Sequence, residues 1–524
     1  MADSDQMPVL HVPVDVLRRH GARLLDPVTA PADRTSRTAG TPGPTAYLAG
    51  SLLVRGLPGP DVEETVARLQ AAADRAGRAV RLAVDPAEED HLAWFRRVGE
   101  GLLDEVGGVY QTRVLLTPAE QGGADIPDPW ELLTLARADG RGPLAADLEH
   151  LLLAAGQDVQ GGGGGYWGGH GGGGGYWGGH GGGGGYWGGH GDGTVPGRTP
   201  LGLTLPDPSR EASRAKRSPV VAVPDTGLGR HPWFDDHPGV QVATELFGMP
   251  VGPPGGLDPD PEGTGVRDDL TGVLDALSGH GTFIAGVIRQ AAPSARILAL
   301  PVMDSGGAVA EHDVHRTLTA LWVTHARAQD GGRADEVVDV LSLSMGFYHQ
   351  DGTVPDHPVR DLMGLFAERG VLVVTAAGND ATRWPLYPSG WAVAGQQRPP
   401  SGPPPLVAVG ALNPDGRTVA MFSNAGPWVT THRVGVNVVS TLPTTFQAAA
   451  QAGLSTEVPE GHRRSTLDVD DHGSGFAVWS GTSFSAPLLA GQLAAHIAQA
   501  EDQGPDPESM RERAWAALDH EMGW

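Results

Sequence analysis

The stretch Gly481-Thr482-Ser483-Phe484-Ser485-Ala486-Pro487 stands immediately before an apolar segment, 488–497, whose apolar residues recur at helical spacing. This pattern predicts a buried helix, and Pro487 fits its first turn, where a missing N–H costs little. Ser483 would then lie at the helix N-terminus, where unpaired N–H groups and the helix dipole favour negative charge. A serine placed there can be a nucleophile beside an oxyanion, or it can simply cap the helix.

Three further motifs each join a short apolar segment to polar residues. They are Asp225-Thr226-Gly227 after the strand-like segment 220–224, Gly279-His280-Gly281-Thr282 before an apolar helix, and Ala376-Ala377-Gly378-Asn379 at the end of a buried strand. Each one alone is also typical of an ordinary turn or strand exit. Four such motifs in the order Asp, His, Asn, Ser are hard to explain as turns.

From about Ser218 to the C-terminus, the chain resembles the subtilisin-like serine proteases, because these four motifs are that family's own. The resemblance implies a serine endopeptidase that acts on protein or peptide substrates. The alternation of strands and helices over 296–412 separately predicts an α/β fold, with a parallel sheet covered by helices on both faces.

The resemblance assigns a role to each motif. Ser483 would be the nucleophile, His280 the base that activates it, and Asp225 the residue that orients the imidazole ring. The side chain of Asn379 and the backbone N–H of Ser483 would hold the oxyanion. The alternative is a catalytically silent or partner-gated effector or scaffold that keeps the subtilisin fold.

A peptide substrate is expected to bind as an added β-strand, because an extended peptide satisfies its backbone groups in that way. By resemblance, Ser344-Met345-Gly346 forms the first wall of the binding cleft, and Ser305-Gly306-Gly307 forms the second wall. Ala376-Ala377-Gly378 would line the primary specificity pocket, where small residues indicate room for sizeable, uncharged side chains. Ordinary turns remain the alternative interpretation of the glycine-rich loops.

The composition of the chain argues against several other classes of partner and chemistry. The chain has 524 residues, a net charge of −25 and no cysteine, so we expect neither nucleic acid nor an anionic membrane as the main partner and no thiol chemistry. The first six residues lack a basic start, and no segment approaches the ~18 apolar residues that span a bilayer, so a cytoplasmic protein is expected. No cofactor is expected. The family's calcium-binding insertion is not apparent before Ala291-Ala292-Pro293, so no metal site is carried over.

The N-terminal third of the chain predicts a separate domain. Residues 1–45 are expected to be loosely ordered, residues 46–156 to form a small α+β domain, residues 157–217 to be a linker, and residues 218–524 to be the protease domain. Within the small domain, the segment 129–156 is expected to be helical, with a break at 140–142. The strand and helix order is similar to that of subtilisin propeptides, so intramolecular regulation by this domain is a possibility.

A ten-residue unit, Gly-Gly-Gly-Gly-Gly-Tyr-Trp-Gly-Gly-His, occurs three times over 161–190. Glycine makes up more than half of the unit, so backbone entropy opposes a packed core and favours a flexible tether that is open to cleavage. The alternatives are metal binding by His170, His180 and His190, and weak self-association through the Tyr-Trp pairs. The segments 249–264 and 446–475 are expected to be surface insertions.

Overall fold

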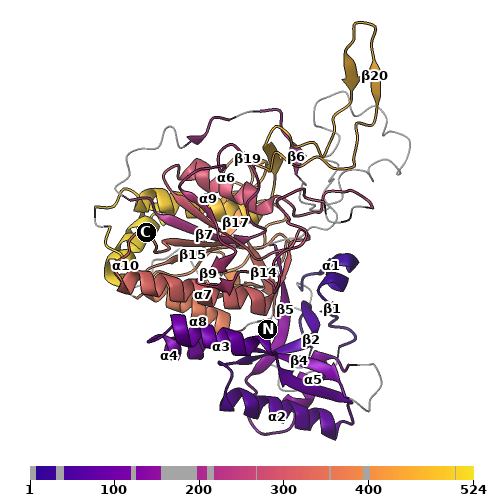
Figure 1. The fold of residues 1–524 in the computed structure, drawn as a ribbon, viewed down its shortest axis with the longest axis vertical. Coiled ribbons are helices and arrows are strands. Elements are labelled where there is room, and N and C mark those ends of the chain that lie inside the picture. The colour runs from indigo at the N-terminus through magenta and orange to yellow at the C-terminus, as the bar shows by residue number, and fades with distance from the viewer. Residues whose placement is uncertain are drawn as a thin grey trace.

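The computed structural model describes residues 7–30, 41–119, 126–154, 198–203, 205–208, 217–266, 268, 270–352, 354, 356–392, 402–501 and 503–524. The glycine-rich repeats, including the three histidines expected as possible metal ligands, lie outside the described residues, as does most of the expected linker 157–217. The described chain forms an N-terminal lobe (7–154) and a larger C-terminal lobe (198–524), drawn in indigo to purple and in magenta to yellow in Figure 1.

The C-terminal lobe is built on a seven-stranded sheet in which every neighbouring pair is parallel. Its order is β18 (Thr431–Val434), β17 (Val407–Leu412), β15 (Leu372–Ala376), β13 (Val340–Leu343), β7 (Val220–Asp225), β11 (Arg296–Pro301) and β8 (Val240–Val242). The central strands are buried on both faces, which explains their nearly continuous apolar sequence.

Helices cover both faces of this sheet, as the alternation of elements predicted. One face packs on α6 (His280–Ala291), α9 (Thr482–Ile497) and α10 (Pro507–Met522). The other face packs on α7 (Glu311–Asp330) and α8 (Pro358–Glu368). Successive residues of β7 divide between the two cores, with Val221 and Val223 on one side and Val220 and Ala222 on the other.

The N-terminal lobe packs helices against an antiparallel sheet. Its elements are α1 (Val14–Arg19), β1 (Ala22–Leu25), β2 (Thr45–Arg55), α2 (Pro60–Arg75), β3 (Val80–Val84), α3 (Ala87–Val98), α4 (Leu103–Val109), β4 (Gln111–Pro118), α5 (Pro129–Arg137) and β5 (Ala146–Ala154). Residues 12–25 are therefore not loosely ordered as expected. They form α1 and β1, because Val12, Val16 and Leu25 are buried against the rest of the lobe.

The prediction of a helix over 129–156 is wrong in its second half. Helix α5 ends at Arg137, and residues 146–154 form the strand β5. The apolar segment Leu151-Leu152-Leu153-Ala154 cannot be assigned from periodicity alone, because a strand buried on both sides and a buried helix look alike over so short a length. Tertiary contacts decide the outcome, since β5 pairs with strands of both lobes.

The two lobes share one sheet and one apolar core. The sheet runs β16 (Leu386–Tyr387), β14 (Met345–Tyr348), β5, β2, β4 and β3, and β12 (Ala308–Ala310) pairs with β5 beside it. The core of the α7 and α8 face also contains Trp94, Phe95 and Tyr110 of the N-terminal lobe. In this structure the N-terminal lobe is thus docked on the C-terminal lobe, and β5 is the strand at their junction (Figure 1).

The remaining strands form small sheets at the edges. They are β6 (Thr199–Pro200), β19 (Val438–Thr441) and β22 (Phe476–Trp479) in one, β9 (Glu245–Leu246) and β10 (Met249–Pro250) in a second, and β20 (Ser455–Glu457) and β21 (Arg463–Ser465) in a third. The hairpin of β20 and β21 is exposed and projects from the body, as expected of a surface insertion. The expected insertion 249–264 differs, because Met249, Val251 and Glu262 are buried.

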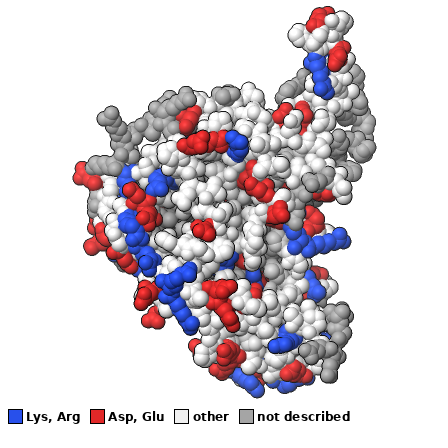
Figure 2. Space-filling model, in the orientation of Figure 1, with Lys and Arg blue, Asp and Glu red and all other residues white. Residues whose placement is uncertain are grey.

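Two general features of the described residues bear on partners. Acidic and basic side chains are interspersed on the face shown in Figure 2, and the basic ones do not gather in one continuous patch there. Within the described ranges, no helix combines the length and the apolar character that crossing a membrane would require.

Candidate active site

Asp225 and His280 meet where the strand β7 ends and the helix α6 begins. Nδ1 of His280 lies 2.7 Å from Oδ1 of Asp225, and both side chains are buried. The same carboxylate oxygen accepts the backbone N–H of Thr226 at 2.8 Å. These contacts fix the orientation of the imidazole and place a carboxylate beside it.

Ser483 is the second residue of α9, and it lies on the helix that the sequence predicted. The hydroxyl of Ser344, at the end of β13, donates to the backbone carbonyl oxygen of Ser483 over 3.1 Å. The ring of Phe484 lies 5.5 Å from the ring of His280, measured between centroids. The predicted serine and histidine are therefore held on two helices that pack together on one face of the sheet.

Asn379 follows β15, and its side chain is anchored on the residue before Ser483. Its Oδ1 accepts the backbone N–H of Thr482 at 2.9 Å and the Thr482 hydroxyl at 2.8 Å. With the oxygen engaged, the amide nitrogen faces Gly481, where an added Cβ would lie 3.2 Å from it. The structure thus holds a side-chain N–H donor beside the start of α9.

The two predicted walls of the cleft flank a strand of the same chain. Gly346 of the first wall lies opposite Leu153 of β5, and Met345 lies opposite Ala154. On the second wall, the carbonyl oxygen of Gly307 accepts the backbone N–H of Ala154 at 2.8 Å, and Ala308 pairs with Leu153. Because β5 runs antiparallel to both β12 and β14, it lies where an added strand would bind.

The side chains of β5 alternate between two environments. Leu152 and Ala154 join the apolar core of the C-terminal lobe, whereas Leu151 packs with Val12 and Val16. Of the residues predicted to line the specificity pocket, Ala376 and Ala377 have no exposed surface in this docked state. A Cβ at Gly378 would lie 2.3 Å from Nδ2 of Asn424, so only glycine fits at this position.

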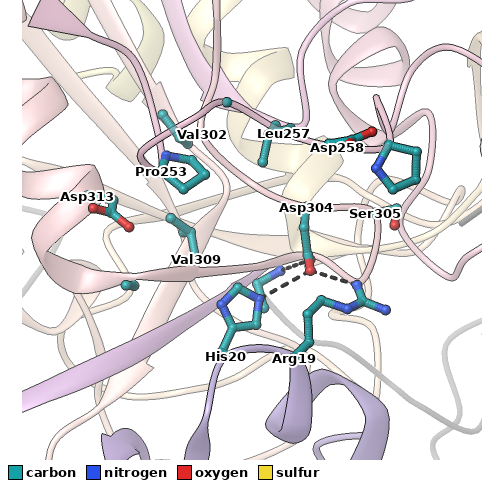
Figure 3. Close-up of a pocket in the computed structure, with 14 residues that line it drawn as sticks. Arg19, His20, Pro253, Leu257, Asp258, Val302, Asp304, Ser305, Val309 and Asp313 are labelled. Carbon is teal, nitrogen blue, oxygen red and sulfur yellow. Dashed lines mark hydrogen bonds and ion pairs between the residues drawn. The ribbon is translucent and has the colours of Figure 1, made fainter. Parts of the chain in front are cut away.

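The first helix of the chain also contacts the second wall. Asp304 immediately precedes this wall, and Figure 3 shows Arg19 and His20 pointing toward it. Its Oδ2 lies 2.6 Å from Nη1 of Arg19 and 3.1 Å from Nε2 of His20. Burial opposes ionisation of Asp304, but the hydrogen bond from His20 and the charge of Arg19 outweigh it and lower its pKa to about 2. A cavity of about 150 Å³ lies beside these residues. An added Cβ at Gly306 would lie 3.0 Å from Val16.

Two histidine–carboxylate pairs cross the boundary between the lobes. Nδ1 of His150 on β5 lies 2.6 Å from Oε2 of Glu311 on α7, and Nε2 of His312 on α7 lies 2.6 Å from Oε1 of Glu88 on α3. Burial disfavours charge on both rings, but the hydrogen bonds to carboxylates outweigh it and raise the pKa of His150 and of His312. In each pair, one residue belongs to the N-terminal lobe and the other to the C-terminal lobe.

Each pair has a second histidine nearby, and the groups Glu88–His91–His312 and His150–Glu311–His357 have the composition of a metal site. In the group His150–Glu311–His357, the hydrogen bonds favour an ion pair instead. Nε2 of His150 faces the amide oxygen of Gln350 at 2.9 Å, so both of its ring nitrogens face acceptors. Nδ1 of His357 accepts the backbone N–H of Val359 at 3.3 Å, which leaves the ring proton on the nitrogen that a metal would need.

The end of α6, where the family's calcium loop was not apparent, carries a positive charge. Arg289 has no exposed surface, and its Nε lies 3.4 Å from a carboxylate oxygen of Asp207. A buried guanidinium repels a divalent cation, so the described residues at this place do not fit calcium, and no step of the proposed chemistry uses it.

Motif reasoning missed one buried acidic residue beside this site. Glu262 contacts the hydroxyls of Thr226 and Thr282, which flank Asp225 and His280 in the sequence. It lies in a segment rich in proline and glycine, and nothing in its local sequence distinguishes it from an exposed loop residue.

A sequence profile described as "Subtilase family" matches residues 216–518, which is more than half of the chain, and the chain therefore belongs to the subtilase family. The match contains the Asp225, His280, Asn379 and Ser483 motifs. The N-terminal lobe lies outside it.

Relatives in this family are distant. Thermitase of Thermoactinomyces vulgaris is 29% identical over 252 residues, which are 48% of this chain and 72% of thermitase. A thermophilic serine proteinase of Bacillus sp. (strain AK1) is 27% identical over 42% of this chain, and the match spans 43% of that protein. A solved structure of a cold-adapted subtilisin-like serine proteinase is also similar, with 18% identity, a TM-score of 0.34, and coverage of 57% of this chain and 82% of that one.

Proposed function

We propose that this protein is a serine endopeptidase with Ser483 as nucleophile, His280 as general base, Asp225 as the orienting carboxylate and Asn379 as an oxyanion donor. One observation carries the proposal: Asp225 holds the His280 ring at 2.7 Å, at the start of a helix that packs against the helix bearing Ser483. Family membership supports the same reaction.

Each residue then has a defined task in peptide hydrolysis. His280 takes the hydroxyl proton of Ser483 as the oxygen attacks the peptide carbonyl, and it later gives that proton to the leaving amine. Asp225 stabilises the imidazolium that forms between these steps. The tetrahedral oxyanion receives hydrogen bonds from the Asn379 amide and the Ser483 backbone N–H. The anchored amide oxygen of Asn379 supports this role, because it fixes the direction of the N–H donor.

The substrate is a peptide in extended conformation that lies between the two walls. Backbone pairing of β5 with Gly307 and Gly346 supports this mode, because it displays the hydrogen bonds that an added strand makes there. The alternating contacts of β5 also indicate which side chains enter the body of the enzyme. Those at the positions of Leu152 and Ala154 do so, and the one at Leu153 does not.

The N-terminal lobe regulates the enzyme by intramolecular occupation of its cleft. Strand β5 fills the place of the substrate, α1 contacts the second wall through Asp304, and the lobes share a core and two buried ion pairs. A peptide substrate has to displace β5 before it can pair with either wall. The enzyme is therefore inhibited while the lobe stays docked.

The competing proposal is a silent or partner-gated scaffold with the same fold. The presence of all four proposed active-site side chains argues against a silent scaffold, whereas the docked lobe agrees with gating. The test is to compare the purified full chain with Ser483→Ala and His280→Ala, using hydrolysis of a denatured protein and mass spectrometry of the chain itself. Either substitution should abolish hydrolysis and any self-processing.

Ser485→Ala is the matched control, since this serine lies on the same helix and its hydroxyl donates to a backbone carbonyl oxygen of Arg433 instead. It should retain activity. Measurable turnover that is equal in the wild-type chain and the Ser483→Ala variant would contradict the proposal.

A further inference from the structure

Glu262 lies directly behind the Asp225–His280 pair, and the reaction proposed above gives it no task. Its residue surface is only 2% exposed, although its segment was predicted to be a surface insertion. A buried carboxylate costs free energy unless hydrogen bonds satisfy it.

The first set of partners is the start of α6. Oε2 of Glu262 accepts the Thr282 hydroxyl at 2.6 Å, and Oε1 faces the backbone N–H groups of Gly281 at 3.2 Å and Thr282 at 3.4 Å. The first N–H groups of a helix have no partner within it, and the helix dipole favours negative charge there. Because His280 is the first residue of α6, Glu262 fixes the turn that carries the imidazole.

The second partner is Thr226, which connects Glu262 to Asp225. The Thr226 hydroxyl oxygen lies 2.5 Å from Oε1 of Glu262 and 3.2 Å from Oδ1 of Asp225. It also accepts the backbone N–H of Gly281 at 2.8 Å. A hydroxyl has one proton, so Thr226 can donate to only one of the two carboxylates at a time.

The protonation state of Glu262 decides which carboxylate receives that proton. When Glu262 is ionised, Thr226 donates to it over the shorter distance. When Glu262 carries a proton on Oε1, it donates that proton to Thr226, and the Thr226 hydroxyl turns to Asp225. Asp225 then has one more hydrogen bond and less negative charge available to His280.

The surroundings of Glu262 favour its protonated state more than water does. Burial raises the pKa of Glu262 to about 7, although the hydrogen bonds from Thr226 and Thr282 oppose the shift. Asp225 on β7 and Asp260 in the same segment add repulsion in the same direction as burial. From the other side, the half-buried guanidinium of Arg198 acts on Glu262 as an attracting charge.

We propose that Glu262 is a positioning residue that sets the basicity of His280 through Thr226 and Asp225. The inference rests on the proposed role of His280 as the base. Glu262 would then support the three catalytic side chains without touching the substrate. The basicity of His280 should depend on whether the Glu262 carboxylate is charged.

The test is a pH titration of the His280 ring by NMR in the full chain, with the resonance identified by its absence from His280→Ala. Glu262→Gln keeps the shape of the side chain but cannot ionise. Its amide oxygen should take the place of Oε1, because the backbone N–H groups of Gly281 and Thr282 face that position, so the mutation removes the negative charge and leaves the contact with Thr226 in place. The pKa of His280 should fall measurably in Glu262→Gln, because a negative charge close to the Asp225–His280 pair is removed. Thr226→Val keeps the carboxylate of Glu262 but removes the hydroxyl that connects it to Asp225, so the His280 titration should no longer follow the charge of Glu262.

Glu311→Gln is the matched control, because it removes a different buried carboxylate, between the two lobes, and should leave His280 unchanged. The same His280 titration curve in wild type and in either Glu262→Gln or Thr226→Val would overturn the proposal. The readout is the ring itself and not turnover, so failure of the endopeptidase proposal would appear separately, as an inactive enzyme with an intact titration shift. If Glu262→Gln does not fold, Thr226→Val carries the same test.

Discussion

The backbone N–H of Ala154 donates a hydrogen bond to the carbonyl oxygen of Gly307 over 2.8 Å, and this contact ties the last strand of the N-terminal lobe to the second wall of the candidate active site. Leu153 lies opposite Gly346 on the first wall at the same time. One strand thus satisfies the backbone groups on both sides of the cleft. Displacement of this strand is therefore the step on which activity toward other proteins should depend.

Replacing Leu152 with aspartate should release the cleft. Leu152 is 5% exposed within the core shared by the two lobes, and an unpaired charge there costs roughly 3 kcal/mol or more. A loss of about 3 kcal/mol corresponds to a roughly hundredfold larger population of the undocked state. Initial rates of hydrolysis of an external peptide should rise accordingly in Leu152→Asp.

The matched control for this change is Leu153→Asp. Its side chain is half-buried on the opposite side of the same strand, so it should raise the rate far less. Equal rates in wild type and Leu152→Asp, with both chains active, would contradict occupation of the cleft by β5.

Removing the amide of Asn379 should slow catalysis without removing the nucleophile. Asn379→Ala should lower kcat by about 10²–10³, the magnitude known for removal of one such donor from subtilisin, which belongs to the same family. Both enzymes are best compared in the Leu152→Asp background, so that docking does not hide the effect. A fall of less than threefold in kcat would remove Asn379 from the oxyanion site.

The shifted pKa values of the histidines at the lobe boundary predict that the free energy of unfolding is greatest near pH 6.5, the ordinary histidine pKa being about 6.5. The pKa of His150 and of His312 is raised in the folded chain, so their contribution is complete below about 6.5 and is lost as pH rises through the raised values. Burial lowers the pKa of His357 to about 4 and that of His315 to about 3, so their contribution is present above about 6.5 and is lost as pH falls toward those values.

Denaturant unfolding of the full chain across pH 4–9 measures this profile. Glu311→Gln removes the hydrogen-bond partner that raises the pKa of His150, so it should flatten the decline on the alkaline side. An unchanged alkaline decline in this variant would show that the His150–Glu311 pair is not its cause.

Cleavage between the lobes should not separate them at once. The glycine content of the segment 157–197 predicts accessible backbone, so an unrelated protease should cut there first. The shared sheet and core should then keep the two fragments together in size-exclusion chromatography. First cuts elsewhere, or immediate separation of the fragments under native conditions, would contradict this expectation.

The motifs predicted the centre of the fold well, because each one combines a buried strand or helix with polar residues at its end. As the sequence indicated, β7 ends at Asp225 and β15 ends shortly before Asn379. Helix α6 begins at His280, and α9 begins one residue before Ser483. A parallel strand buried on both faces has a continuous apolar sequence, and this makes its position easy to read.

The sequence could not show what depends on contacts between distant segments. Strand β5 was predicted as a helix, because its apolar residues are explained only by pairing with β12 and β14, more than 150 positions away. Glu262 was assigned to a surface loop, because only the folded chain brings it to Thr226 and Thr282. The sequence predicts the N-terminal part as a separate domain, but in this structure the two lobes share one apolar core. This packing also depends on contacts between distant segments.

The most direct test of the central claim is covalent labelling of the chain with a fluorophosphonate, followed by peptide mapping by mass spectrometry. The experiment is best carried out on Leu152→Asp, in which the cleft should be open. The account predicts an adduct on Ser483, no adduct at that position in Ser483→Ala, and labelling slowed by orders of magnitude in His280→Ala. An unmodified Ser483 in the folded Leu152→Asp chain, or labelling that does not depend on His280, would contradict it.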